Sequence, residues 1–245
     1  MKELFFEEAV TTAKASLTVK LDVGRLDVQT HDKPLILVEA RVKKATVEVS
    51  RAGDDVTVVA RTKRGSNWLA LLGSNARSEL TITVPPECRL YLKTATGSVQ
   101  VEDVLAPVMV KTATGSAQLR NLGGSIEATV VTGKLAYEGA LSSDNHTFKV
   151  VTGSIHLGLT NEPDAELSAR TVTGSIRCQF PLQNQKRDRQ FVGDKLRGEL
   201  GEGLGELRLT AVTGSITIAD KRQTKDEAHA VKDELRVTKE ELYTT

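Results

Sequence analysis

The sequence is poor in aromatic residues, in cysteine and in long apolar runs, and each shortage removes a class of protein. Aromatic side chains make up only 4% of the 245 residues, so the core must be aliphatic. Two cysteines, Cys88 and Cys178, are too few for a disulfide framework. No stretch approaches the roughly 20 apolar residues of a membrane-spanning helix, and the N-terminus has no secretory signal pattern. We therefore expect a cytoplasmic protein.

An excess of charge of either sign is also missing. The chain has 33 basic and 32 acidic residues, which gives a formal net charge of +1. This balance provides no global field that would attract nucleic acid, so we predict no nucleic-acid partner. A hydrophobic fraction of 39% is typical of a folded protein rather than a disordered one.

What the sequence does contain is an internal repeat. Six segments carry a Thr-Gly step between two alternating stretches: KTATGSVQV, KTATGSAQL, TVVTGKLAY, KVVTGSIHL, RTVTGSIRC and TAVTGSITI. Their glycines, spaced by 18, 18, 20, 21 and 40 residues, are Gly97, Gly115, Gly133, Gly153, Gly174 and Gly214. A seventh copy surrounds Gly24. A near-constant period in the twenties is typical of a solenoid.

Within each repeat, apolar residues alternate with polar ones on both sides of the glycine. They stand seven, five and three residues before it and two and four residues after it, which is the period of half-buried strands. Because the inward positions change from odd to even across the glycine, the chain must bend there. Glycine tolerates the positive φ that such a bend can require, so we predict that these seven glycines are structural turns.

One such coil cannot bury enough apolar surface to fold alone, so the coils must stack. Direct stacking predicts an all-β parallel β-helix-like solenoid with coils of about 18–21 residues. Antiparallel hairpins closed at each Thr-Gly are the alternative, and they would give a meander or a sandwich. We predict one domain over residues 1–220, with irregular coils over 10–90 and regular repeats over 90–220. The connector 180–206 is either a long excursion or a degenerate coil, and 221–245 is a charged tail or a short helix.

The repeated register, [TV]-x-T-G-S-I-x-[VIL], and the element Thr83-Val84-Pro85-Pro86 carry a family resemblance. The chain resembles the bacterial "putative adhesin" family of β-strand repeats over roughly residues 10 to 220. The resemblance implies a right-handed β-helix-like fold of unknown function, found in cell-envelope or stress-response settings. Many members of that family carry a signal peptide or a membrane anchor, and this sequence shows neither.

Catalytic chemistry on a β-helix needs grouped carboxylates, and the sequence does not place them together. The outward row three residues after each glycine reads Gln, Gln, Ala, His, Arg and Thr, so we predict no enzyme, no cofactor and no small-molecule substrate. The four histidines fall at unrelated offsets, which argues against a metal site and for solvated side chains: His31, His146, His156 and His229. Cys178 falls on an inward position, which predicts a buried thiol.

The strongest functional candidate is the segment SNWLALLGSN, residues 66–75, which breaks the alternation. If exposed, Trp68, Leu69, Leu71 and Leu72 would form a contact loop for a protein partner or a membrane surface; the alternative is that they fold back over the end of a coil. We predict a non-enzymatic scaffold or binding protein acting through protein–protein contacts or self-assembly. A carbohydrate-active β-helix enzyme and a polymerising cytoskeletal β-helix are the alternatives.

Overall fold

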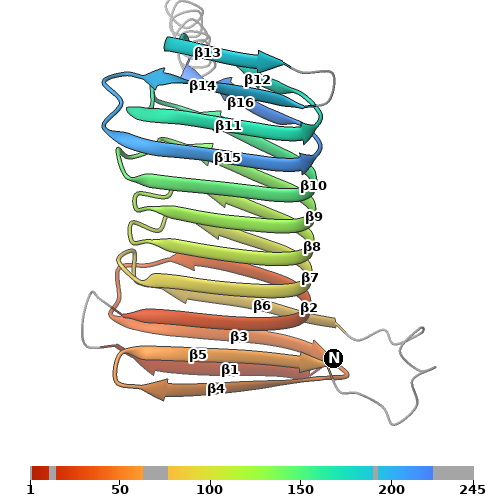
Figure 1. Ribbon diagram of the computed structural model, residues 1–245. Coiled ribbons are helices and arrows are strands. Elements are labelled where there is room, and N and C mark those ends of the chain that lie inside the picture. The colour runs from red at the N-terminus through yellow and green to blue at the C-terminus, as the bar shows by residue number, and fades with distance from the viewer. Residues whose placement is uncertain (1, 11–14, 63–76, 190–192, 223–245) are drawn as a thin grey trace, which may run out of the picture.

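A computed structural model describes residues 2–10, 15–62, 77–189 and 193–222, and its described elements are all β-strands joined into one network of sixteen. Figure 1 shows them as a tall stack of short coils. The first eight strands are β1 (Lys2–Ala9), β2 (Ser16–Thr30), β3 (Leu35–Lys43), β4 (Ala45–Ala52), β5 (Asp55–Thr62), β6 (Arg77–Val84), β7 (Arg89–Glu102) and β8 (Val108–Arg120). The other eight are β9 (Ile126–Gly139), β10 (Asn145–Leu159), β11 (Ala165–Thr173), β12 (Ile176–Cys178), β13 (Gln183–Arg189), β14 (Asp194–Leu200), β15 (Gly205–Thr213) and β16 (Ile216–Asp220).

The long strands of the middle coils bend at their glycines and so belong to two layers. We call the halves before the glycine the first layer and the halves after it the second layer. Neighbouring coils pair in parallel at equal offsets in both layers, for example Leu90 with Val108 and Val101 with Leu119. The prediction of an all-β fold with mostly parallel strands is therefore confirmed, because equal offsets place identical parts of successive repeats side by side.

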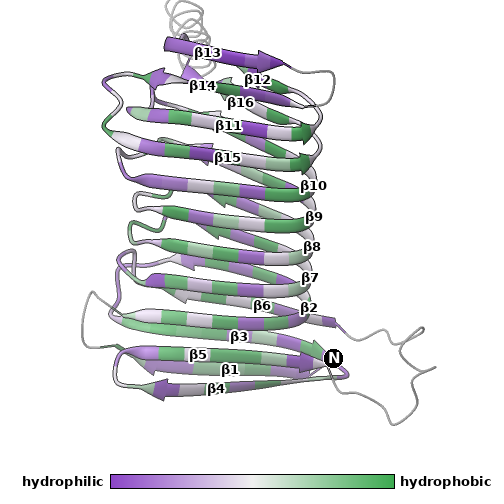
Figure 2. Ribbon diagram, viewed as in Figure 1, coloured by the Kyte–Doolittle hydropathy of each residue, from purple (hydrophilic) through white to green (hydrophobic). Residues whose placement is uncertain are grey.

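The inward offsets fill a single aliphatic core between the layers. Leu90, Leu92 and Val99 are fully buried, and the same offsets are buried in the neighbouring coils. Figure 2 shows the resulting alternation of hydrophobic and hydrophilic residues along the strands. Two aromatic residues within this core, Tyr137 and Phe148, lie with ring centroids 6.0 Å apart. Alternation of period two thus translates directly into one buried and one exposed face for each strand.

The N-terminal end departs from parallel stacking. Strands β5 and β6 form one parallel coil beside β2, with Ala60 opposite Leu21 and Ser78 opposite Gly24. Strand β5 therefore ends, and β6 begins, beside the place where β2 has its glycine corner. Strands β3 and β4 are not the parallel coils that we predicted: β3 runs antiparallel to β6, and β4 runs antiparallel to β5. Strand β1 is antiparallel to β3 in turn.

The C-terminal end departs in a different way, because the last repeat does not stack after the one before it. The order along the first layer is β10-β15-β11-β14-β13, so β15 lies between β10 and β11. The connector 180–206 is an excursion rather than an extra parallel coil: it contains β14, which is antiparallel to β11, and β13, which is antiparallel to β14. This connector is long enough to let the chain pass beyond β11 and return to the free place beside β10.

Candidate functional site

The glycine corner is the most regular feature of the surface. All seven turn glycines have φ between 135° and 149°, a region that favours glycine. A Cβ atom on Gly115 would lie 1.7 Å from the carbonyl oxygen of Gly97, and the same close approach recurs from coil to coil. The corner is therefore a column of backbones in contact, and both its conformation and its spacing require glycine.

A row of basic side chains runs along the outer face of the first layer, four residues before the glycines. We call it the basic row: Lys20, Lys93, Lys111, Lys149 and Arg170. Lys93 lies directly opposite both Lys20 and Lys111, while threonines at the same offset, Thr129 and Thr210, separate the later members. The row crosses adjacent strands, which are spaced by about 4.7–4.9 Å.

A second row, of small apolar residues, lies beside the basic row and nearer the corner. We call it the valine row: Ala95, Ala113, Val131, Val151, Val172 and Val212. Its four valines are 42–45% exposed. Because offsets of four and two face the same side of a strand, the two rows form one band of charge beside one band of hydrocarbon.

A wide groove of about 1260 Å³ lies on the outer face at the N-terminal end of the corner. Four basic and two acidic side chains line it, and most of them alternate in sign from strand to strand along Glu3, Arg41, Glu79 and Arg25. Arg41 pairs with Glu3 at 3.0 Å, and Arg25 pairs with Asp27 at 2.7 Å. Opposite charges on neighbouring strands stabilise a sheet. We therefore interpret these charged side chains as a stabilising feature of the sheet.

The N-terminal end of the stack carries an apolar edge strand. In the described part of the chain, β1 pairs only with β3 and leaves its other edge free. Leu4 and Phe6 are only partly buried where they pack against the core, and Phe5 on the opposite face is 59% exposed. A free edge with three adjacent apolar residues, Leu4, Phe5 and Phe6, favours pairing with another strand.

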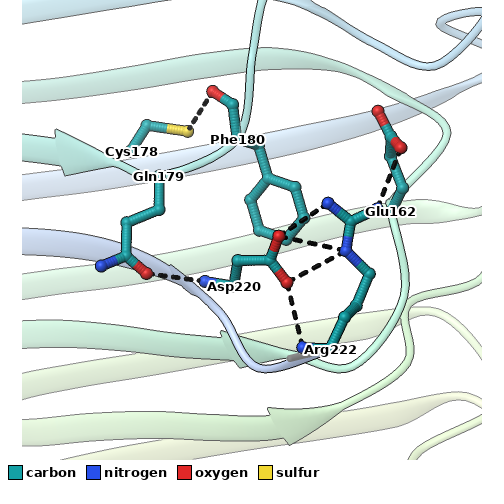
Figure 3. Close-up of polar contacts among 6 residues, drawn as sticks. All are labelled: Glu162, Cys178, Gln179, Phe180, Asp220 and Arg222. Carbon is teal, nitrogen blue, oxygen red and sulfur yellow. Dashed lines mark hydrogen bonds and ion pairs between the residues drawn. The ribbon is translucent and has the colours of Figure 1, made fainter. Parts of the chain in front are cut away.

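A cluster of charged and hydrogen-bonding groups lies beside the end of β16, as Figure 3 shows. Arg222 donates to Asp220 through two nitrogens and to Glu162 at 3.0 Å, and its guanidinium lies 5.1 Å from the centre of the Phe180 ring. Hydrogen bonding from Arg222 lowers the pKa of Asp220, and the same bond raises the pKa of Arg222. Gln179 accepts a bond from the Asp220 amide at 2.8 Å.

An ion pair between a buried carboxylate and a partly exposed arginine lies at the C-terminal end of the stack. The Asp194 side chain is 1% exposed and accepts two hydrogen bonds from Arg187, at 2.6 and 3.1 Å, and one from the Ile176 amide at 3.1 Å. Burial alone would raise the pKa of Asp194, but the bonds from Arg187 and Ile176 outweigh it and lower the pKa. The sequence did not single out this pair, since neither residue belongs to the repeat.

Two of the predicted side-chain environments need correction. His146 is not solvated: it is 1% exposed, because it occupies the inward offset of seven where other coils have leucine, valine or isoleucine. Burial lowers its pKa, although Nε2 lies 3.0 Å from the Ser142 carbonyl. Cys178 is only half-buried, because its strand, β12, has a partner on one side alone among the described strands. Burial nevertheless raises the pKa of its thiol.

The predicted contact loop, Trp68, Leu69, Leu71 and Leu72, lies outside the described residues, as does the predicted C-terminal tail or helix from residue 223 onward. Within the described ranges, no group of three or more His, Cys, Asp or Glu side chains is placed to hold a metal ion. Among those same residues, no helix is long and apolar enough to cross a membrane.

The fold, with its repeated Thr-Gly corners, defines the class of bacterial β-strand-repeat proteins that the sequence resembles. The chain belongs to the family described as Toastrack DUF4097, whose profile matches residues 9–219. A crystal structure of a putative cell adhesion protein from Clostridium sporogenes is 14% identical, with a TM-score of 0.55, and covers 90% of this chain and 100% of its own. A putative adhesin from Bacteroides fragilis is 11% identical, with a TM-score of 0.41, over 89% of this chain and 97% of its own.

A comparison with curated proteins finds no match. The resemblance stated from the sequence is confirmed by the family profile. The likeness to the Clostridium sporogenes protein, at 14% identity, shows the fold alone.

Proposed function

We propose that this protein is a non-enzymatic scaffold that acts through protein–protein contacts, the first of which is self-association through β1. The observation that carries the proposal is the free edge of β1, where Phe5 is exposed and Leu4 and Phe6 are only partly buried. Exposed apolar edges are usually blunted by charge, as in β13, whose seven residues QNQKRDR are all exposed and include four charged side chains. Strand β1 has no such protection over Leu4, Phe5 and Phe6.

A second copy of β1 complements the first in one antiparallel register. If Phe5 lies opposite Phe5 of the other copy, Leu4 lies opposite Phe6 on the core side, and Lys2 lies opposite Glu8. The like-charged contact in this register joins Glu3 and Glu7, and Arg41 neutralises Glu3 within its own copy at 3.0 Å. Charge and apolar character thus support a two-fold contact centred on Phe5.

A contact of this kind is closed, because the same edge is used by both copies. It supports a dimer rather than the polymerising cytoskeletal alternative, which needs the N-terminal edge to meet the C-terminal edge. In the first layer such a filament would join β4 to β13, and the charged, exposed β13 is a poor partner for another strand.

A charge swap with mixing tests the proposal. Lys2→Glu places Glu opposite Glu8, and Glu8→Lys places Lys opposite Lys2, so each variant alone should dimerise less. Two symmetry-related pairs change from attraction to repulsion, each worth up to about 1 kcal/mol, so the dissociation constant should rise about tenfold or more. An equimolar mixture of the two variants restores both pairs and should dimerise again, as measured by sedimentation equilibrium.

Lys186→Glu, on the edge strand at the other end, is the matched control and should leave the dimer unchanged. A wild-type chain that stays monomeric would overturn the proposal. So would a dimer that ignores all three substitutions, because the contact would then lie elsewhere on the molecule.

A further inference from the structure

We infer that the band formed by the basic row and the valine row is a binding surface for a linear acidic polysaccharide that lies along the stack. This surface is on the outer face of the first layer, away from the edge of β1, so the inference stands independently of self-association. It starts from the strand register, which places basic side chains at one offset on five of the seven neighbouring strands from β2 to β11.

The basic row by itself destabilises the folded protein. Like charges directly opposite on neighbouring strands destabilise a sheet, yet Lys20, Lys93 and Lys111 follow one another without interruption. Threonine at the same offset in β9 and β15 shows that the fold accepts a neutral side chain there. The uncompensated charge therefore points to an external anion.

Internal neutralisation of the row is slight. Among the described residues, Lys111 forms an ion pair with Glu127 at 3.3 Å, and no ion pair links Lys20, Lys93, Lys149 or Arg170 to a carboxylate. The valine row contributes no charge, and Asp22 is the acidic residue at its offset in the first regular coil. An anionic polymer laid across the strands would meet one cation at most steps.

The spacing of the strands and the exposed valines beside the basic row indicate which kind of anionic polymer fits this surface. Strands repeat every 4.7–4.9 Å or so, which is close to the length of one pyranose unit, so a carboxylate on each sugar can follow the row. The exposed valines lie beside the row and can contact the C–H face of the same sugars. Proteins that bind single-stranded nucleic acid instead use aromatic side chains as stacking platforms, and Tyr91, 39% exposed, is the large exposed aromatic residue on this face in the described chain.

A membrane surface is a weaker fit for the band. Helices and other elements that lie on membranes insert large side chains such as Trp, Phe and Leu into the interface. The apolar residues of the band are alanine and valine, which reach little beyond the backbone. The observations therefore favour a polymer that lies against the face over a bilayer that must be penetrated.

Binding of oligogalacturonate, measured by isothermal titration calorimetry on the full chain, tests the inference. The triple variant Lys93→Gln/Lys111→Gln/Lys149→Gln removes the centre of the row. Three exposed ion pairs at about 0.5 kcal/mol each amount to about a tenfold loss of affinity. The matched control, Lys33→Gln/Lys43→Gln/Lys134→Gln, removes the same charge from other surfaces and should bind like the wild type. Affinity should also rise with the length of the oligomer until the row is covered.

Three outcomes would overturn the inference. Wild-type chain that binds no oligogalacturonate excludes the ligand class, and an equal loss in both triple variants means that the attraction is unspecific. Tighter binding to single-stranded DNA or to vesicles containing phosphatidylserine, with the same dependence on the basic row, would assign the surface to another class of ligand. Matched circular dichroism spectra of the three chains keep a folding defect from being read as a binding defect.

Discussion

The middle coils and the two ends of the stack solve the same problem of pairing strands in different ways. In the middle, from β7 to β10, each coil meets an equivalent coil at equal offsets, and the contacts are those of the repeat. At the ends the repeat has no equivalent neighbour, and antiparallel strands replace it: β3, β4 and β1 at one end, β14 and β13 at the other. Regularity thus depends on having a like neighbour on both sides.

The largest expected effect comes from breaking the corner in the middle coils. Gly115→Ala would place a Cβ atom 1.7 Å from the Gly97 carbonyl oxygen at a φ of 135°, so two backbones must separate. We expect a loss of more than about 4 kcal/mol in the free energy of unfolding, or failure to fold.

Gly53→Ala is the control for this prediction, because Gly53 also has positive φ, at 66°, but nothing within 4 Å of the added atom. Its cost should be about 1 kcal/mol. Urea denaturation of both variants checks the comparison. Similar, small losses for the two would mean that the close approach between coils does not constrain the corner.

A smaller effect is expected from the Asp194–Arg187 pair at the C-terminal end. Asp194→Ala removes a buried carboxylate that accepts hydrogen bonds from Arg187 and from the Ile176 amide, so it should lower the free energy of unfolding by about 1–3 kcal/mol. Asp220→Ala, which removes a more exposed pair with Arg222, should cost less.

The pH dependence follows from the lowered pKa of Asp194. Because the folded chain holds this carboxylate ionised more strongly than the unfolded chain does, its contribution is present above the ordinary aspartate pKa of 3.8 and is lost as the pH falls through the folded pKa. Denaturation at pH 7 and at pH 3 should therefore show the difference between wild type and Asp194→Ala shrinking in acid. A difference that stays constant would show that the ion pair is not its source.

The smallest effect concerns two buried hydroxyls in the middle coils, and it is stabilising. The Oγ1 atoms of Thr94 and Thr112 are buried with no hydrogen-bond partner. Valine already occupies the same offset in the next two coils, as Val130 and Val150. Thr94→Val and Thr112→Val should each raise the free energy of unfolding by about 1 kcal/mol, because an unsatisfied buried hydroxyl is removed.

Thr171→Val is the matched control at this offset. Thr171 donates to the Gly214 carbonyl at 3.2 Å, so its loss should destabilise by about 1 kcal/mol. Thermal denaturation of the three variants checks the sign of each change. The same sign at all three positions would mean that hydrogen bonding does not separate them.

The sequence predicted the middle of the stack well and the ends poorly, for one physical reason. The offsets of residues from Gly97, Gly115 and Gly133 predicted where the strands lie and which of their faces are buried, because each coil repeats the environment of the coil before it. Residues of β3, β4 and β14 also alternate, and alternation does not distinguish a parallel partner from an antiparallel one. The right-handed winding stays a prediction.

The two candidate surfaces, the basic row and the free edge of β1, also differ in how far the sequence predicts them. The basic row could be read from the offset of four before each glycine, although its meaning depends on which coils are neighbours. The free edge of β1 could not be read at all, since an edge exists only relative to the rest of the sheet. His146 was predicted to be solvated because histidine is a polar residue. It is buried instead, because it stands at an inward offset of the repeat.

The amino-acid sequence by itself determined the all-β class, the period of the coils, the inward faces and the need for glycine at the corners, because these follow from local alternation and backbone sterics. The tertiary structure alone decided the order of the coils, with β15 between β10 and β11, and the antiparallel ends. Which strands become neighbours depends on which strand edges remain free once the chain has folded back, and no local sequence pattern contains that information.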